Sequence, residues 1–183
     1  MSYKLPDIST LPTLPQAEQD EVLTHLFEPS ETLFTYLRPY LSTSYSSYIE
    51  LIETSRTAFL KLVDDKERDD LIKDSRIGDI IACHPRLGVP KTTKLSEHSS
   101  KEQKSLQSDD ETIKKFVTLN ETYESQFPGL RFVCFVNGRP RDEIVGIFQD
   151  RIDKNDYKQE VIDALNAMCD IAIDRFKKIQ PKI

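Results

Sequence analysis

The stretch GDIIACHPRLG, residues 78–88, is the part of the sequence around which the rest of the chain is organised. The apolar pattern before it predicts a helix that reaches Cys83, and Pro85 disfavours helical backbone at the residue that precedes it. His84 is therefore expected at the end of the helix, with its ring free to point out of the bend. An imidazole in such a place can exchange protons near neutrality, because its ordinary pKa is about 6.5.

Two roles for His84 are open from this stretch alone. A charged histidine at a helix C-terminus has a structural role, since the helix dipole stabilises it by about 0.3–1 kcal/mol. A histidine held by rigid backbone on both sides is also suited to acid–base chemistry. The choice between the two roles depends on the other residues of the chain.

Length and composition predict one domain with a substantial apolar core. The chain has 183 residues, of which 38% are hydrophobic, and its net charge is −6. A negative chain without a basic cluster is unsuited to nonspecific nucleic-acid binding. No apolar run approaches about 18 residues, so no membrane span is expected. The N-terminal residues lack the apolar segment of a secretory signal.

The cysteines indicate a reducing compartment. Cys83, Cys134 and Cys169 are odd in number, far apart and set in apolar runs, as is typical of buried free thiols. No spacing of cysteine and histidine resembles a zinc site, so we expect no metal. The location is expected to be cytoplasmic or peroxisomal, since the C-terminal Pro181-Lys182-Ile183 weakly resembles a peroxisomal address.

Helical periodicity predicts an all-α fold, a single-domain bundle of about eight helices with one short extended segment. Residues 1–15, with three prolines among polar residues, are expected to form an extended arm, and residues 16–183 the helical domain. The helices are expected at residues 16–27, after Ser30 as N-cap, at 45–63, from 68 to 84, as a short helix within 96–103, and at 110–127, 140–152 and 157–179.

The extended segment is LRFVCFV, residues 130–136, which is rich in β-branched and aromatic side chains. A lone extended segment has no sheet to join, so its backbone amides are available to a loop or a ligand.

Three polar features stand out against the helical pattern. The segment from Gly88 to Asp110 is polar and long enough to be either functional or disordered. Within it, Ser99 and Glu102 have the spacing of a capping box, which would be a structural role. Asn120 lies on an apolar stripe and is expected to bond the backbone of a neighbouring loop. Arg175 lies at the edge of the last helix's buried stripe, where an arginine pairs with a carboxylate, extends to water, or clamps a carboxylate or a planar urea-like ligand.

Read together, these segments resemble the 2-oxo-4-hydroxy-4-carboxy-5-ureidoimidazoline (OHCU) decarboxylases of uric acid breakdown. The resemblance covers about residues 25–178. It is carried by the motifs HPRLG (84–88), SSKEQ (99–103), LNETY (119–123), FVCFVNG (132–138) and IAIDR (171–175).

The resemblance implies a site for this chain. The family's catalytic histidine corresponds to His84 and its acidic partner to Glu102, which is expected to fix the tautomer of His84. The other implied substrate contacts are Pro85, Ser99, Gln103, Arg175 and the backbone at Phe132 and Val133.

The same resemblance implies a function. It predicts a cofactor-independent carboxy-lyase that converts its ureidoimidazoline substrate to (S)-allantoin and CO₂ in purine catabolism, as a homodimer. The alternative is a helical binding or adaptor protein that keeps the fold without turnover. A pure scaffold has no need of His84, Glu102 and Arg175 together.

Overall fold

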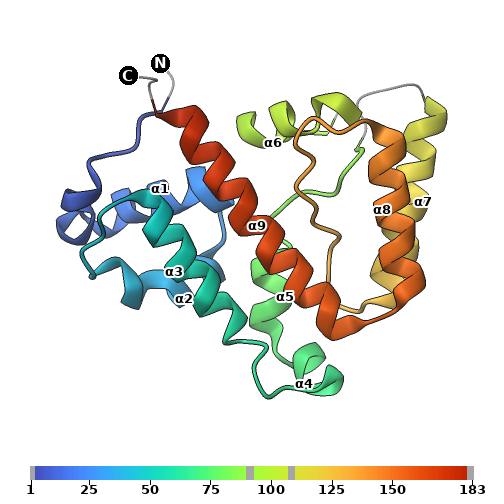
Figure 1. The fold of residues 1–183 in the computed structure, drawn as a ribbon, viewed down its shortest axis with the longest axis horizontal. Helices are drawn as coiled ribbons and strands as arrows, with labels where there is room; N and C mark the ends of the chain where they lie inside the picture. Colours follow the sequence, from blue (N-terminus) through green and yellow to red (C-terminus); the bar gives the residue numbers. More distant parts are fainter. Residues whose placement is uncertain (1–2, 90–92, 107–109, 181–183) are drawn as a thin grey trace.

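The computed structural model describes residues 3–89, 93–106 and 110–180. Over these residues the chain forms nine α-helices and two short 3-10 helices, without a strand (Figure 1). The all-α prediction is confirmed, with one α-helix more than the expected eight. The C-terminal Pro181-Lys182-Ile183 lies outside the described residues, as do residues 90–92 of the polar segment.

The helices follow one another with short connections. Their bounds are η1 (Ile8–Thr13), α1 (Gln16–Phe27), α2 (Glu31–Leu41), α3 (Tyr48–Leu60), α4 (Arg68–Lys73), α5 (Ser75–Ile81), α6 (Glu97–Glu102), η2 (Lys104–Leu106), α7 (Asp110–Gln126), α8 (Arg141–Lys154) and α9 (Tyr157–Ile179).

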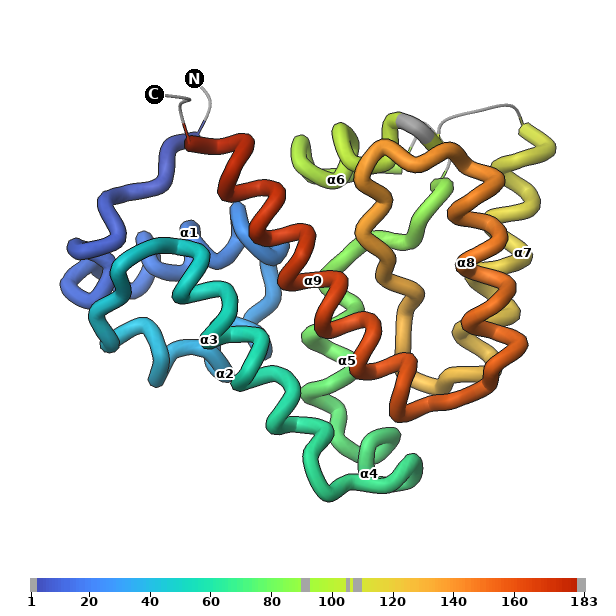
Figure 2. Tube along the Cα trace, in the orientation of Figure 1, coloured from blue at the N-terminus to red at the C-terminus, as the bar shows by residue number. Residues whose placement is uncertain are grey.

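The longest helix, α9, forms the middle of the molecule. It contacts α1, α3, α4 and α5. In Figures 1 and 2, α1–α3 lie on one side of α9, and α6–α8 lie on the other. Residues on α9 therefore reach both halves of the fold.

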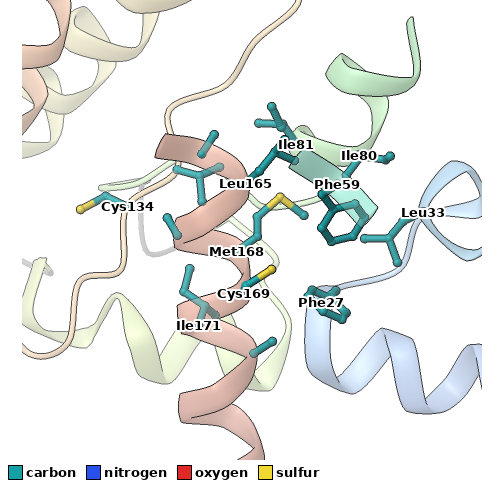
Figure 3. Close-up of a cluster of buried hydrophobic side chains, with 14 of the residues drawn as sticks. Phe27, Leu33, Phe59, Ile80, Ile81, Cys134, Leu165, Met168, Cys169 and Ile171 are labelled. Atoms are coloured by element: carbon teal, nitrogen blue, oxygen red, sulfur yellow. The ribbon is translucent and has the colours of Figure 1, made fainter. Parts of the chain in front are cut away.

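The apolar core surrounds α9. Phe27, Phe59 and Met168 are completely buried, and Figure 3 shows them together with leucine and isoleucine side chains from the neighbouring helices. Burial of each such side chain stabilises the fold by about 1.5–3 kcal/mol. The apolar stripes read from the sequence thus meet in one core.

The N-terminal arm is not fully extended, contrary to expectation. Residues 8–13 form η1, whose N-cap Asp7 accepts a hydrogen bond from the Ser9 amide at 2.9 Å. Leu11 within η1 is completely buried. Capping by Asp7 and burial of Leu11 outweigh the extended preference of a proline-rich segment.

The single helix expected to run to His84 is wrong in two respects. Asp74 has an extended backbone and separates α4 from α5, because its side chain accepts from the Arg76 amide and caps the second helix. In addition, α5 ends at Ile81, and a turn carries the chain to His84, whose amide donates to the Ile81 carbonyl at 3.3 Å.

The expected caps have different outcomes. Ser30 caps α2 as predicted, accepting from the Leu33 amide at 3.2 Å. The prediction of a capping box formed by Ser99 and Glu102 is wrong, because Ser96 is the N-cap of α6 and accepts from the Ser99 amide at 3.1 Å. Ser99 and Glu102 are thereby left without that structural role.

The extended segment is confirmed. Residues 130–136 cross the molecule without helix or strand.

None of the helices in the described part of the chain has the length and apolarity that a membrane crossing requires.

Candidate functional site

A cavity of about 370 Å³, including its open mouth, lies where the turn after α5, helix α6, the extended segment and α9 meet. Its lining residues are His84, Pro85, Leu87, Ser99, Glu102, Gln103, Ile171 and the segment Phe132–Val136. Seven of the eight residues expected at the site line this cavity, and the eighth, Arg175, lies behind them.

His84 is buried against the cavity, with 4% of its surface exposed. Its Nε2 atom has no hydrogen-bond partner among the described residues. Burial, together with the positive charge of Arg175, lowers the pKa of His84 from 6.5 to about 3, although Glu28 acts in the opposite direction. The imidazole is therefore neutral near pH 7, which contradicts the structural alternative of a charged histidine at a helix end.

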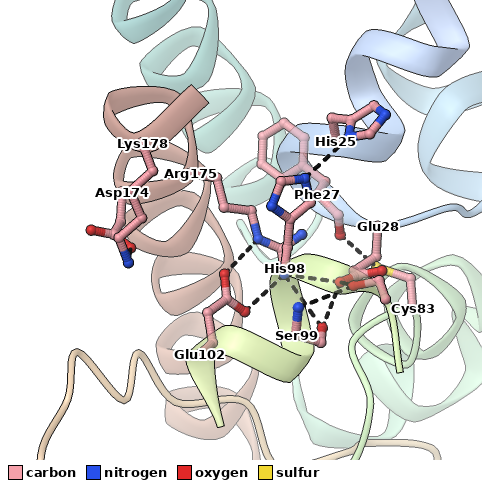
Figure 4. A network of polar contacts seen from close by, with 11 residues as sticks. His25, Phe27, Glu28, Cys83, His98, Ser99, Glu102, Asp174, Arg175 and Lys178 are labelled. Carbon is pink, nitrogen blue, oxygen red and sulfur yellow. Dashed lines mark hydrogen bonds and ion pairs between the residues drawn. The ribbon is translucent and has the colours of Figure 1, made fainter. Parts of the chain in front are cut away.

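Arg175 is the polar centre behind the cavity, with 1% exposure. Its Nε and Nη2 atoms donate to the two oxygens of Glu102 at 2.6 and 2.9 Å. Nη2 also donates to Glu28 Oε1 at 2.9 Å, so one guanidinium holds two carboxylates (Figure 4). The expected pairing of Arg175 with a carboxylate is confirmed, whereas direct contact with the cavity is not observed among the described residues.

Glu28 is a site residue that the sequence analysis missed. Its carboxylate is buried and accepts from the hydroxyls of Ser96 and Ser99 at 2.7 and 2.6 Å. Burial raises the pKa of Glu28, but the charge of Arg175 and the two serine hydroxyls outweigh it, so the pKa is lowered and the side chain is ionised.

The sequence signal for Glu28 is its place directly before Pro29, at the predicted break between two helices. In the structure Glu28 follows the completely buried Phe27, and its backbone has a φ of 83°. A non-glycine residue in that conformation is uncommon and marks a place held by its surroundings.

The expected contact between Glu102 and His84 is not observed among the described residues. Its recorded hydrogen bonds among the described residues go to Arg175, since a guanidinium offers two parallel donors to a carboxylate. Glu28 is instead the carboxylate whose charge acts on His84. Glu102 still lines the cavity, so it lies within reach of a bound molecule.

Two amide side chains hold the turn that follows His84. Gln103 accepts from the Gly88 amide and donates to the Arg86 carbonyl, both at 3.0 Å. Asn120 donates to the Leu87 carbonyl at 3.1 Å, which confirms its expected bond to a loop backbone. Gln103 thus lines the cavity and fixes its wall at the same time.

The extended segment supplies the remaining wall. Phe132 and Val133 are buried and line the cavity. Among the described residues, no acceptor is recorded for the backbone N–H groups of residues 132–136. These amides agree with the expectation that the segment has donors to offer.

Within residues 3–89, 93–106 and 110–180, no group of three or more metal-ligating side chains is present.

The family model described as OHCU decarboxylase matches residues 12–177. A search of curated proteins finds no match to the chain.

Proposed function

Because the chain belongs to the OHCU decarboxylase family, we propose that it converts 2-oxo-4-hydroxy-4-carboxy-5-ureidoimidazoline to (S)-allantoin and CO₂. Membership implies a decarboxylase of uric acid degradation. The observation that best supports the specific reaction is the neutral, buried His84, whose Nε2 has no partner among the described residues, at a cavity that Glu102 and Gln103 also line.

In the proposed reaction His84 carries the proton. The bond between the ring carbon and the carboxylate breaks, CO₂ leaves, and the electron pair is delocalised into the ring. One proton from solvent, delivered through the imidazole to one face of the ring, balances the reaction and sets the configuration of the product. A positioned proton transfer of this kind contributes about 10²–10⁴-fold to the rate.

The low pKa of His84 results from burial and from the charge of Arg175. A bound carboxylate substrate brings negative charge close to the imidazole and raises its pKa, since an opposite charge favours the imidazolium. Substrate binding therefore makes His84 a stronger base at the time when it is needed.

Hydrogen bonds to the substrate are assigned to the cavity walls. The free amides at Phe132 and Val133 and the second N–H of Gln103 are donors for ring and ureido carbonyls. Glu102, held at two points by Arg175, is an acceptor for the ureido N–H groups. Ser99, which is bonded to Glu28, and Pro85 complete the binding surface.

The test is a stereochemical assay. Substrate is made fresh from urate, and circular dichroism follows the formation of optically active allantoin. We expect the protein to accelerate the reaction and to give the S product, whereas spontaneous decay gives a racemate. A spontaneous rate and racemic product in the presence of the folded protein would contradict the proposal and favour the adaptor alternative.

Replacement of Glu102 tests the role assigned to its carboxylate. Glu102→Gln keeps the shape but loses the charge that Arg175 holds, so turnover should fall strongly while helicity remains. Cofactor independence, a homodimer and a cytoplasmic or peroxisomal location remain predictions from the sequence.

A further inference from the structure

Arginine side chains hold the extended segment in place of a neighbouring strand. Arg151 Nη1 donates to the Val133 carbonyl at 2.9 Å, and Arg139 Nε donates to the Val136 carbonyl at 3.2 Å. Arg139 Nη2 also donates to the Phe135 carbonyl. Buried carbonyls need such partners, so the path of this segment depends on guanidinium groups.

Arg131 differs from these two arginines because it reaches away from its own segment. Its Nη1 atom donates to the carbonyls of Ala82 and His84, both at 2.9 Å. Ala82 is the C-cap of α5, where carbonyls lack intrahelical partners and a cation is favoured. One side chain thus joins the backbone of the catalytic histidine to the residue just before Phe132.

We propose that Arg131 is a positioning residue that fixes the distance between the His84 imidazole and the backbone amides of Phe132 and Val133. This inference rests on the proposed function, because it assigns a proton carrier and hydrogen-bond donors to the two walls that Arg131 connects. An arginine stays charged at every working pH, so the link persists whatever the protonation state of His84.

Positioning has a measurable consequence for the reaction. A misplacement of about 1 Å between reacting groups can lower a rate by about 10²-fold. Protonation on one face also depends on how the substrate lies between His84 and the amides. Loss of Arg131 is therefore expected to affect both kcat and the optical purity of the product.

The experiment compares Arg131→Met with Arg131→Lys. Met keeps the length of the side chain and removes its donors, so kcat should fall about 10–100-fold with a smaller change in KM, and the allantoin should lose optical purity. Lys retains donors for the two carbonyls and should restore most of both properties. Enzyme in excess makes the spontaneous racemic route negligible, and optical purity does not depend on the fraction of folded protein.

Arg56→Met is the matched control. Arg56 is also half-buried and donates from Nη1 to a backbone carbonyl, that of Asn166 at 3.0 Å, but it does not line the cavity. This variant should keep the kcat and optical purity of the wild type. If Arg131→Met also keeps both, or if Arg56→Met loses them equally, the inference is wrong.

Amide hydrogen exchange separates this inference from the proposed function. Arg131→Met should accelerate exchange in both walls, at the hydrogen-bonded amides of Ala82 and His84 and at that of Leu130, which donates to the Phe127 carbonyl at 3.0 Å, whereas Arg56→Met should not. Unchanged exchange in either wall would overturn the inference even if the wild type shows no turnover. If Arg131→Met does not fold, Arg131→Gln, which keeps one donor group, replaces it in the same comparisons.

Discussion

Arg175 and Arg151 are both buried arginines that pair with glutamate, one behind the cavity and the other behind the extended segment that forms one of its walls. Arg175 holds Glu28 and Glu102 behind the cavity, as described above. Arg151, on α8, pairs with Glu160 at 2.8 Å and lies 4.4 Å from the centre of the Phe132 ring. Tyr123 donates its hydroxyl to the same glutamate at 2.6 Å.

The two networks differ in what they leave without a partner. Around Arg175, the His84 Nε2 and Arg175 Nη1 atoms are buried and have no hydrogen-bond partner among the described residues. Around Arg151, the Nη2 atom is also buried without a hydrogen-bond partner among the described residues, but it lies 2.8 Å from Glu160 within the ion pair. The carboxylate of Glu160 is bonded by both an arginine and a tyrosine. Unpaired buried polar atoms cost about 1–3 kcal/mol each. Of these atoms only His84 Nε2 belongs to a residue that lines the cavity, which indicates that stability is given up there for a ligand. The unpaired Arg151 Nη2 belongs to an ion pair that serves the fold.

The largest effect is expected for His84→Asn, which should lower activity and leave stability nearly unchanged. Turnover should fall about 10²–10⁴-fold, because the proton carrier is removed, while the unfolding temperature should stay close to that of the wild type. The rate of formation of optically active allantoin and the thermal unfolding curve measure the two effects. A variant that keeps more than a tenth of the wild-type rate would show that His84 is not the proton carrier.

Glu160→Gln tests whether the network of Arg151 contributes to stability more than to turnover. It leaves the buried charge of Arg151 without its carboxylate, so the free energy of unfolding should fall by about 3–5 kcal/mol. The kcat of the remaining folded protein should fall less than tenfold. Urea denaturation gives the stability, and the double variant Arg151→Met/Glu160→Leu should recover much of it by removing both charges.

The pH dependence of the free energy of unfolding should show a smaller effect, which depends on His84. The pKa of His84 is lowered from 6.5 to about 3, so between these values the unfolded chain binds a proton that the folded chain does not. Stability should therefore fall as the pH falls from about 6.5, by about 2 kcal/mol from this group at pH 5. His84→Asn should lack this loss in urea denaturation at pH 7 and pH 5.

The pKa values of His25 and His98 are also lowered, first of all by burial, and both act in the same direction. Both are present in each protein, so their contributions cancel in the comparison with His84→Asn. Equal pH dependence of the two proteins would contradict a buried, neutral His84.

The smallest expected effect is that of Tyr123→Phe. The variant removes one hydrogen bond to Glu160 and keeps the aromatic contacts with Phe127 and Phe132. The free energy of unfolding should fall by about 1 kcal/mol, since Arg151 still bonds the carboxylate. A loss as large as that of Glu160→Gln would show that the tyrosine, and not the ion pair, holds this network.

The sequence alone predicts most of the helices and most of the cavity. Apolar periodicity locates α1, α7 and α9 almost to the residue, because their buried faces are long. The apolar pattern does not show where a polar side chain bonds a backbone amide and starts a new helix. The break at Asp74 and the cap at Ser96 were therefore missed. The family motifs bring His84 and Gln103 to one site.

Contacts between distant segments explain the remaining errors. Glu28 and Arg175 are 147 residues apart in the sequence, and their pairing depends on how α1 and α9 pack. The pairing of Glu102 with Arg175 in place of His84 has the same origin. Neither spacing nor composition contains this information.

The central helix links the two networks mechanically. Glu160 and Arg175 both belong to α9 and are fifteen residues apart, which corresponds to about 22 Å along the axis and a little more than four turns. A continuous helix of this kind acts as a stiff spacer, so Arg175, which holds the two carboxylates behind the cavity, cannot shift along the axis while Glu160 stays in place. Heat inactivation should accordingly coincide with global unfolding and should not precede it.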